Sequence, residues 1–252
     1  MYELSSLSDV LSQWIVVRND SLKSCFNIIA QFEEIIVEEE INNKAFGSGF
    51  NPLRQFDIDE RTHSLIIGNF LNPLFAHGQK RLFLNHFLRL LHIISPEDGT
   101  WEVCIEAGRI DILLRRQDPH TVIVIENKSN FAIDQTSQLY RYWYEYIYQP
   151  NQQDRSIDFL SEQTYSQEGV RRRYRIIYLS PARSKIPSEQ ALKKPYWLDK
   201  AMPEKIPIMV DHIFYGEFIV EWLENCKRDI PATNHRLRDY VDLYIGLWKP
   251  KT

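Results

Sequence analysis

The sequence predicts an α/β protein in which a β-sheet is flanked by helices. Short runs of β-branched and aliphatic residues lie in the middle of the chain, at 101–106, 109–115, 121–127 and 174–179. Segments whose apolar residues have helical spacing precede and follow these runs. Because strands and helices succeed one another in this way, the pattern is typical of a sheet covered by helices.

The outer elements are expected as follows. Three helices precede the sheet, at 20–44 with an acidic surface, at 58–72 and at 79–94. An aromatic helix follows the first three strands, at 134–148, with Asp134 or Ser129 as its cap. Residues 149–170 are polar and lack a sustained period, which predicts a loop or mobile insertion near the charged residues described below. A last strand is expected at 206–210, with helices at 216–228 and 233–247.

Composition limits the class of protein. The chain has 252 residues, of which 44% are hydrophobic, so it can bury a substantial core. We expect one domain over 1–252, with an N-terminal helical part to about residue 95, a core over about 96–215 and C-terminal helices beyond it. The formal net charge of −4 gives no global basic field, and no glycine pattern for nucleotide phosphates is present.

Location follows from what the sequence does not contain. No apolar stretch approaches the length of a membrane span, and the first residues do not form a signal peptide. The three cysteines lack paired spacing, which argues against a zinc site or a disulfide framework. We therefore expect a cytoplasmic protein.

Two charged segments lie in neighbouring β-runs. Asp111 lies inside the first run, and Glu126-Asn127-Lys128 ends the second. Turn residues near Asp118-Pro119 separate the runs, which predicts a β-hairpin. Antiparallel pairing about this turn places Asp111 opposite Glu126 and Leu113 opposite Val124, because each pair of numbers has the same sum.

Three charged groups should then meet on one apolar face. Lys128 lies two residues beyond Glu126 and projects on the same side of the strand. This expectation depends on the register, because a slip of one residue would send Asp111 to the opposite face. The alternative interpretation is a solvated, charged edge of an ordinary hairpin.

Opposed carboxylates predict a cation between them, because they otherwise repel each other. Mg²⁺ is held by one or two carboxylates, keeps several waters and leaves positions for phosphate oxygens. Asp111 and Glu126 therefore predict a Mg²⁺ site, in which Mn²⁺ should substitute. Lys128 would orient or activate an attacking water, or stabilise charge developing on a phosphate.

Three stretches, in order, resemble the PD-(D/E)XK nuclease superfamily and within it a bacterial and phage group. They are Glu60 to Leu88, Glu106-Ala-Gly-Arg-Ile-Asp111, and Ile125-Glu-Asn-Lys128 followed by Gln138-Leu139-x-x-Tyr142. The resemblance implies a restriction-endonuclease-like core with a mixed central β-sheet flanked by helices. It implies Asp111 and Glu126 as metal ligands and Lys128 as the catalytic lysine. It also implies that Asn127 contributes its backbone carbonyl to the metal, and that Glu60 adds a ligand or binds a metal water.

Glu60 also has a structural interpretation. Asp57-x-x-Glu60 matches a capping box, in which Glu60 would serve the start of the helix. Asp57 and Asp59 are expected to be cap and first-turn residues. His63 falls on the same helical face as Glu60 and would either hydrogen-bond a carboxylate or pack.

Further polar residues are candidates for contact with the substrate. Gln135, Gln138 and Tyr142 form one helical stripe, and the resemblance favours Gln138 as the amide that holds a scissile phosphate or a metal water. The alternative is a polar surface stripe. Candidate phosphate contacts are two basic clusters, of which the first is favoured, although each could be a solvated loop edge. They are Arg171, Arg172 and Arg173 with Arg175, and Arg183, Lys185, Lys193 and Lys194.

The sequence as a whole predicts a Mg²⁺-dependent nuclease that hydrolyses phosphodiester bonds with a metal-activated water. Nucleic acid is the expected partner, with DNA favoured and no membrane involved. A homodimer or a larger complex is left open. The alternatives are a ribonuclease, and a catalytically silent relative of the nuclease fold that binds nucleic acid or protein.

Overall fold

The computed structural model describes residues 3–47, 50–93, 97, 99–107, 110–154 and 156–249. The chain divides into two compact units, residues 1–52 and 53–252. The sequence predicts a single domain over 1–252, a range that includes both units. The first unit is built on α1 (Glu3–Phe46), which begins well before the helix predicted at 20–44.

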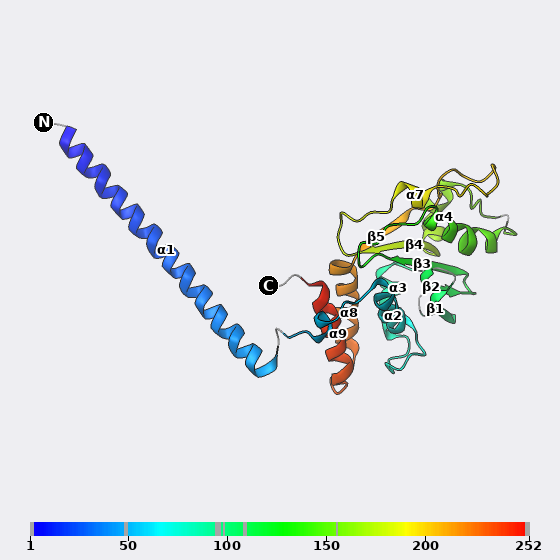
Figure 1. The fold of residues 1–252 in the computed structure, drawn as a ribbon, viewed down its shortest axis with the longest axis horizontal. Coiled ribbons are helices and arrows are strands. Elements are labelled where there is room, and N and C mark those ends of the chain that lie inside the picture. The colour runs from blue at the N-terminus through cyan, green and yellow to red at the C-terminus, as the bar shows by residue number, and fades with distance from the viewer. Residues whose placement is uncertain are drawn as a thin grey trace. The chain divides into compact units, whose positions relative to one another are not determined.

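The described part of the second unit contains a five-stranded mixed sheet in the order β1-β2-β3-β4-β5 (Figure 1). The strands are β1 (Trp101–Ala107), β2 (Ile110–Arg116), β3 (Thr121–Asn127), β4 (Tyr174–Ser180) and β5 (Val210–Phe214). The first three strands are antiparallel, whereas β3, β4 and β5 run parallel to one another. This is the predicted α/β class, and the mixed sheet is consistent with a restriction-endonuclease-like core.

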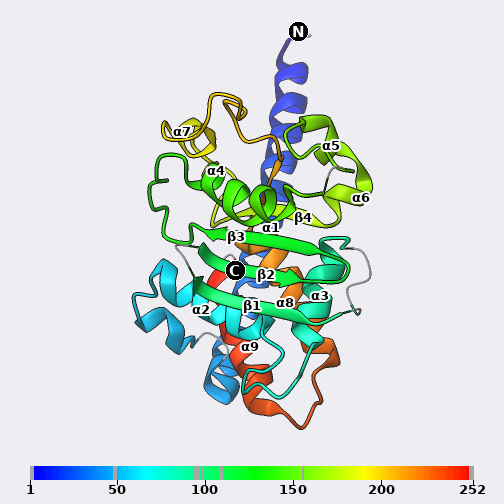
Figure 2. The same ribbon diagram turned by 90° about the vertical axis from the view of Figure 1, so that its right-hand side faces the viewer.

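Helices cover both faces of this sheet, as Figure 2 shows. One layer contains α2 (Glu60–Leu71), α3 (Leu82–Leu90), α8 (Val220–Asp229) and α9 (His235–Trp248). The other contains α4 (Gln138–Tyr142), α5 (Glu162–Ser166), α6 (Glu168–Arg171) and α7 (Glu189–Leu192). Alternation along β3 supplies both layers, because Ile123 and Ile125 join the first core and Val122 and Val124 the second.

Helix α2 lies close against the edge of the sheet. A Cβ atom on Gly68 would lie 2.5 Å from Ile105 Cγ1, so only glycine allows this approach. Asp59 begins the helix, since its side chain accepts a hydrogen bond from the Thr62 backbone N–H. The capping box expected from Asp57 to Glu60 is therefore not formed, because Glu60 is the first residue of the helix rather than its third.

The aromatic segment differs from the single helix predicted at 134–148. Helix α4 begins only at Gln138, after Ser137 in a left-handed conformation, and neither Asp134 nor Ser129 caps it. A π-helical turn, Trp143–Tyr148, and a 3-10 turn, Gln149–Asn151, continue the segment. Tyr140, Tyr142 and Trp143 are buried in the second core.

Two other predictions in this region need correction. Residues 149–151, 162–166 and 168–171 form short helical turns, whereas the described residues between 152 and 161 are irregular, as a loop would be. The turns and the loop pack on the second core through Phe159, Tyr165 and Val170. They lead into the start of β4 and so lie at the end of the sheet away from Glu126 and Lys128. The strand predicted at 206–210 is also displaced, because the last strand, β5, begins only at Val210. Pro207 has no N–H for a ladder, so Ile206 and Ile208 are buried in the core without pairing in a strand.

The C-terminal helices agree with the prediction within a few residues. A π-helical turn, Tyr215–Ile219, leads into α8, and α9 follows. None of the helices in the described ranges is both long and apolar enough to cross a membrane.

Candidate active site

The hairpin β2–β3 has the predicted register. Leu113 pairs with Val124, and Arg115 pairs with Val122. The same register extended to the end of the ladder sets Asp111 opposite Glu126. Gly108 and Arg109, which belong to the stretch that ends at Asp111, lie outside the described residues.

Asp111 and Glu126 form a repelling pair in a poorly solvated place. Glu126 is only 2% exposed, and Asp111 is half-buried. Burial first, and then the charge of Glu126, raise the pKa of Asp111 to about 8. Burial also raises the pKa of Glu126, against the opposing effect of Lys128. The free energy of the pair would therefore be lowered by a further cation.

Lys128 is the positive member of this group. Its Nζ atom lies 2.6 Å from Glu126 Oε1, and the residue is 5% exposed. Burial alone would lower the pKa of the ammonium, but the neighbouring carboxylates, Glu126 first, leave that pKa above its ordinary value. Lys128 therefore keeps its proton at neutral pH and acts as a donor and a positive charge.

Gln138 and Tyr142 hold Glu126 from the other side. Gln138 Nε2 donates to Glu126 Oε1 over 2.8 Å, and the Tyr142 hydroxyl donates to Glu126 Oε2 over 2.9 Å. The backbone N–H of Gln135 donates to Gln138 Oε1, which fixes the amide's orientation. Gln138 is buried, so the stripe is part of the charged site rather than a polar surface. Gln135 itself precedes the helix and is exposed.

Asn127 projects to the opposite face and ties three segments together. Its amide nitrogen donates to the Glu60 carbonyl and the Ser64 hydroxyl, at 2.8 and 3.0 Å. Its amide oxygen accepts from the Ser129 N–H and the Tyr215 hydroxyl, at 3.1 and 2.7 Å. The Asn127 backbone N–H donates to Asp111 Oδ2 over 2.6 Å. These hydrogen bonds hold Asn127 in one position. The role of its backbone carbonyl as a metal ligand stays a prediction.

Glu60 lies beside this group but is engaged by the backbone. Its Oε1 atom accepts hydrogen bonds from the N–H groups of Asn130 and Ala132, each over 3.1 Å. Its charge reaches the site, since it raises the pKa of both Glu126 and Lys128. Glu60 thus holds the segment that follows Lys128, and its role as a ligand remains a prediction.

His63 does not reach the carboxylates. Its Nδ1 atom lies 2.9 Å from the hydroxyl oxygen of Tyr244, and its ring packs against Tyr215 and Trp248. Burial lowers the pKa of His63 to about 4, so it is neutral at physiological pH. The packing interpretation of His63 is the one that the structure supports.

The two basic clusters lie at opposite ends of β4. Arg171, Arg172 and Arg173 precede the strand, whereas Glu126 pairs with Tyr178 near its end, roughly 13 Å away along the strand. Arg171 lies 3.6 Å from a carboxylate oxygen of Asp211, and Arg172 is paired with Glu168. Their contact with phosphate stays a prediction, and it does not concern the phosphate at Glu126.

The second cluster begins at the end of β4 that is near the carboxylates. Arg183 is paired with Glu217 but remains 73% exposed at its side chain. Lys185 Nζ lies 3.8 Å from Asp134 Oδ1, whose carboxylate also accepts from the Tyr178 hydroxyl. Lys194 is held by Glu204. Position along β4 therefore favours Arg183 over the arginine cluster as a neighbour of the site.

The residues present suit a hard divalent cation. In the described ranges, no group of three or more His, Cys, Asp or Glu side chains is arranged to hold a metal ion. A pair of carboxylates is nevertheless sufficient for Mg²⁺, which usually retains waters and phosphate oxygens as its other ligands. Burial and the charge of Glu126 raise the pKa of Asp111, and a cation beside the pair would oppose both effects.

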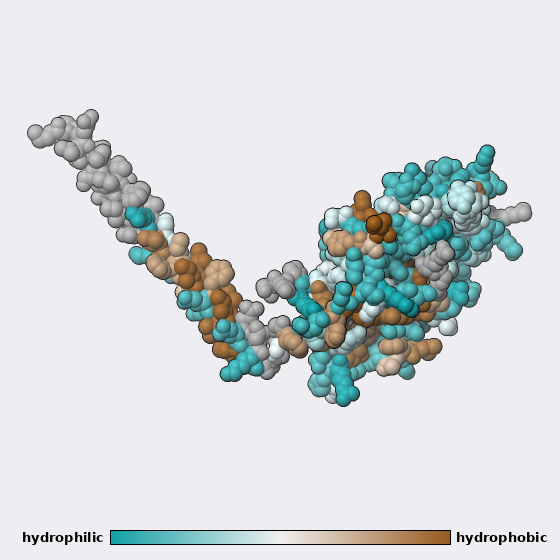
Figure 3. Space-filling view, in the orientation of Figure 1, coloured by the Kyte–Doolittle hydropathy of each residue, from teal (hydrophilic) through white to brown (hydrophobic). Residues whose placement is uncertain are grey.

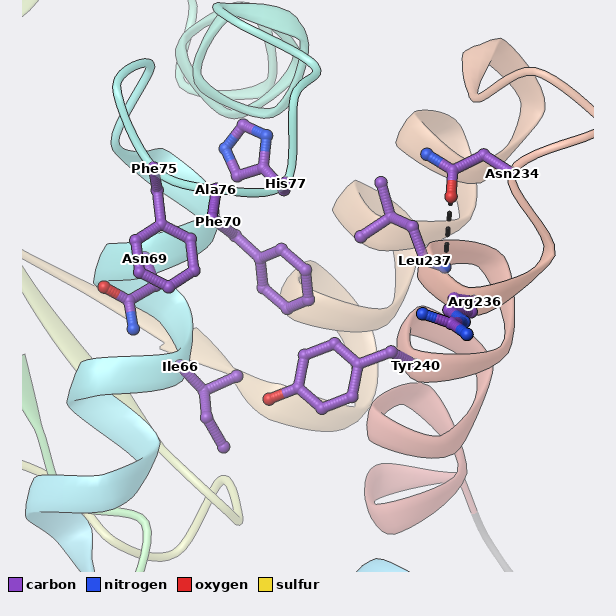
Figure 4. Close-up of a pocket in the computed structure, with 10 residues that line it drawn as sticks. All are labelled: Ile66, Asn69, Phe70, Phe75, Ala76, His77, Asn234, Arg236, Leu237 and Tyr240. Carbon is purple, nitrogen blue, oxygen red and sulfur yellow. Dashed lines mark hydrogen bonds between the residues drawn. The ribbon is translucent and has the colours of Figure 1, made fainter.

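A separate hollow of about 480 Å³ lies between α2 and α9 (Figure 4). Phe70 and Tyr240 point toward each other in this view, with ring centroids 5.6 Å apart. None of the carboxylates, Lys128 or Gln138 lines it. It is not part of the charged site.

Comparisons with known proteins agree with this description. A family model described as PD-(D/E)XK nuclease superfamily matches residues 50–244, which is more than half of the chain. Searches of curated proteins and of solved structures gave no match.

Proposed function

Because the chain belongs to the PD-(D/E)XK nuclease superfamily, we propose that it is a Mg²⁺-dependent deoxyribonuclease whose site is built on Asp111, Glu126 and Lys128. The observation that carries this proposal is the pair formed by buried Glu126 and half-buried Asp111 beside a protonated lysine. An ordinary charged hairpin edge would be solvated. Here Glu126 and Lys128 are buried, and directed hydrogen bonds hold Glu126.

We assign the metal ligands to Asp111, Glu126 and the backbone carbonyl of Asn127, with Glu60 as a further ligand or the holder of a metal water. When bound there, Mg²⁺ supplies Lewis acidity that lowers the pKa of a water and neutralises charge on the phosphate. Tyr142 and Gln138 keep the Glu126 carboxylate in one orientation, since each donates to it. Such outer partners of ligands tune metal affinity.

Lys128 is assigned to the reacting phosphate and its water. An ammonium has no lone pair for a metal, so its N–H groups serve oxygen atoms. One of them is directed at Glu126 Oε1, which leaves the others for the phosphate and the water. Its raised pKa keeps it charged, which suits stabilisation of the developing negative charge better than proton abstraction. Gln138 is proposed to contact the phosphate or a metal water once Glu126 engages the metal.

DNA is the substrate that the family resemblance favours, and RNA is the alternative that an assay must separate. Discrimination between them requires a contact to the 2′-hydroxyl. Labelled single- and double-stranded DNA and RNA are therefore incubated with the full chain, with Mg²⁺, with Mn²⁺ and with EDTA. We expect cleavage of DNA that requires a divalent metal. Metal-independent cleavage, or cleavage of RNA alone, would contradict the proposal.

Two variants link any activity to this site. Lys128→Ala is expected to abolish cleavage, whereas Lys227→Ala, which removes a lysine paired with Asp242 on another helix, is expected to retain it. Equal activity of the two variants would mean that the cleavage comes from elsewhere in the chain or from a contaminant.

A further inference from the structure

A row of large apolar side chains lies exposed on α1. They have between 47% and 67% of their surface open, and Figure 3 shows them as a brown region along the described part of the helix. They are Leu22, Phe26, Ile28, Ile29, Phe32, Ile35, Ile36, Val37 and Ile41. Contiguous apolar surface of this extent marks an interaction site.

These side chains have the spacing of a coiled coil. Leu22, Ile29 and Ile36 repeat every seven residues, and Cys25 and Phe32 lie between them at the alternating positions. The polar face is narrow and includes Asn27, Gln31, Glu34 and Glu38. A long helix gains most of its stability from packing such an apolar face, so α1 requires a partner.

Helix α1 lies outside the residues that match the nuclease family. The match to the nuclease family begins at residue 50, after the end of α1 at Phe46. Helix α1 is therefore an addition to that module. An added helix with a coiled-coil stripe is suited to assembly.

The charges of α1 are divided between its two halves. From 18 to 31 the charged residues are Arg18, Asp20 and Lys23. From 32 to 46 they are Glu33, Glu34, Glu38, Glu39, Glu40 and Lys44. The first segment has a formal charge of 2 − 1 = +1 and the second has 1 − 5 = −4. An acidic polar surface also disfavours an anionic membrane or a nucleic acid as the partner.

We propose that α1 packs antiparallel against α1 of a second copy of this chain. In a parallel pair, the glutamate-rich halves of the two copies would lie side by side and repel each other. In an antiparallel pair, each glutamate-rich half lies beside the half with Arg18 and Lys23. The helix thus complements itself in one orientation only.

The residues that flank the stripe favour the same orientation. Ile28 and Ile35 lie along one edge of the stripe, and Glu33 and Glu40 lie along the other. In a parallel coiled coil unlike edges meet, which would set the isoleucines against the glutamates. In an antiparallel one like edges meet, so Ile28 lies beside Ile35 of the second copy and the apolar seam widens.

We place Ile29 level with Phe32 of the second copy at the centre of the pair. This register sets Cys25 level with Ile36 of that copy, and Leu22 level with Glu39 where the apolar stripe ends. Lys23 is then level with Glu38. These relations follow from a constant sum of residue numbers in an antiparallel pair.

The oligomeric state of the full chain tests the proposal. We expect light scattering during size-exclusion chromatography to give a dimer. Ile29→Glu with Ile36→Glu should raise the dimer dissociation constant by at least about a hundredfold, because each copy would bury two charges in the shared seam. The matched control, Asn27→Glu with Gln31→Glu, adds the same charge on the polar face and should leave the dimer intact. Circular dichroism verifies that both variants keep their helix content.

Cross-linking tests the relative direction of the two α1 helices and adds no charge to the apolar stripe. Cys104→Ser leaves the exposed Cys25 and the buried Cys226 as thiols, and Ile36→Cys adds one on α1. A bis-maleimide shorter than the roughly 16 Å rise between positions 25 and 36 of one helix can join them only between copies. We expect efficient dimer bands with Ile36→Cys and weak ones without it.

Three results would overturn the proposal. The first is a wild-type chain that stays monomeric at every concentration. Binding of that monomer to zwitterionic phospholipid vesicles would show that the apolar stripe contacts lipid instead. The second is a dimer that the two glutamates at 29 and 36 leave unchanged. The third is equally efficient bridging of Cys25 without Ile36→Cys, which indicates parallel helices. None of these results depends on cleavage, so they stand apart from the proposed nuclease activity.

Discussion

The ammonium nitrogen of Lys128 lies 2.6 Å from Glu126 Oε1, and both residues are buried. Strand alternation brings the two side chains to the same face, opposite Asp111 on the neighbouring strand. The group therefore contains two carboxylates and one ammonium, of which Glu126 and Lys128 are buried and Asp111 is half-buried. Its formal charge is negative when both carboxylates ionise, and this imbalance is the physical basis of the proposed metal site.

The two carboxylates should respond in opposite directions when neutralised in the metal-free protein. Asp111→Asn is expected to raise the free energy of unfolding, because it removes a carboxyl that must be protonated on folding or else lie as a charge beside Glu126. Glu126→Gln is expected to lower it by on the order of 3 kcal/mol, because it leaves the buried ammonium of Lys128 without its partner. Urea denaturation in EDTA measures both. The account of the pair fails if both variants shift stability in the same direction.

Both substitutions should weaken metal binding. We expect Mn²⁺ affinity, measured by calorimetric titration, to fall at least tenfold, roughly the effect of losing even an outer partner of a ligand. Asp229→Asn, which removes an exposed carboxylate beside His86, is the matched control. Unchanged affinity in both site variants would remove the metal-site assignment.

The pKa of Asp111 predicts how metal affinity and stability depend on pH. Its folded-state pKa is raised from 3.8 to about 8, so the stability that neutral Asp111 contributes is complete below pH 3.8 and is lost as the pH rises through about 8. Metal binding at pH 6 to 7 must displace this proton. Mn²⁺ affinity should therefore rise about tenfold per pH unit toward pH 8 and then level off. Asp111→Asn should lack this rise, and a wild-type affinity independent of pH would contradict the assignment.

Tyr142 is expected to act through Glu126. Tyr142→Phe removes the hydroxyl that donates to Glu126 Oε2 and should lower Mn²⁺ affinity about tenfold while leaving the fold intact. Tyr146→Phe is the control, since no hydrogen bond joins Tyr146 to Glu126 among the described residues. A purely structural role for Tyr142 would lower stability and leave metal affinity unchanged.

The arginine cluster before β4 provides a separate test of nucleic acid contact. Arg171→Ala with Arg173→Ala should weaken binding and reduce the slope of log affinity against log salt by up to about 2, because two phosphate contacts are lost. The rate of cleavage within the complex should not change, since the cluster lies away from Glu126. Arg228→Ala with Arg236→Ala removes the same charge elsewhere. Equal slopes for the two double variants would mean that the cluster is only a solvated edge.

Local sequence predicted the hairpin and its register well. The turn and the alternation of apolar residues in β2 and β3 specify which side chains share a face, so the meeting of Asp111, Glu126 and Lys128 could be expected. The displaced strand at 206–210 shows the limit of this reasoning. Ile206 and Ile208 are buried in the second core but precede β5, which begins at Val210. Hydrophobicity alone does not separate a buried strand from a buried segment outside the sheet.

The hydrogen-bond partners of the site were harder to predict. The i, i+4 spacing of Gln138 and Tyr142 placed them on one helical face, but only the packing of α4 on the sheet shows that this face meets Glu126. Tyr215 lies 88 residues from Asn127 in sequence, and no local pattern indicates their contact. The helix that begins at Glu60 was predicted from sequence. The hydrogen bonds that Glu60 accepts from the backbone N–H groups of Asn130 and Ala132 depend on tertiary structure and could not be predicted.

The most direct test of the central claim is single-turnover cleavage of DNA by Lys128→Ala at saturating enzyme. We predict that the variant binds Mn²⁺ and DNA within a few-fold of wild type, yet cleaves on the order of 10² times more slowly, because one charge that acts on the transition state is missing. Lys128→Arg should restore little, since a guanidinium is wider and does not fit the place of an ammonium. A near-wild-type cleavage rate for Lys128→Ala would contradict the assignment of this site as the nuclease centre.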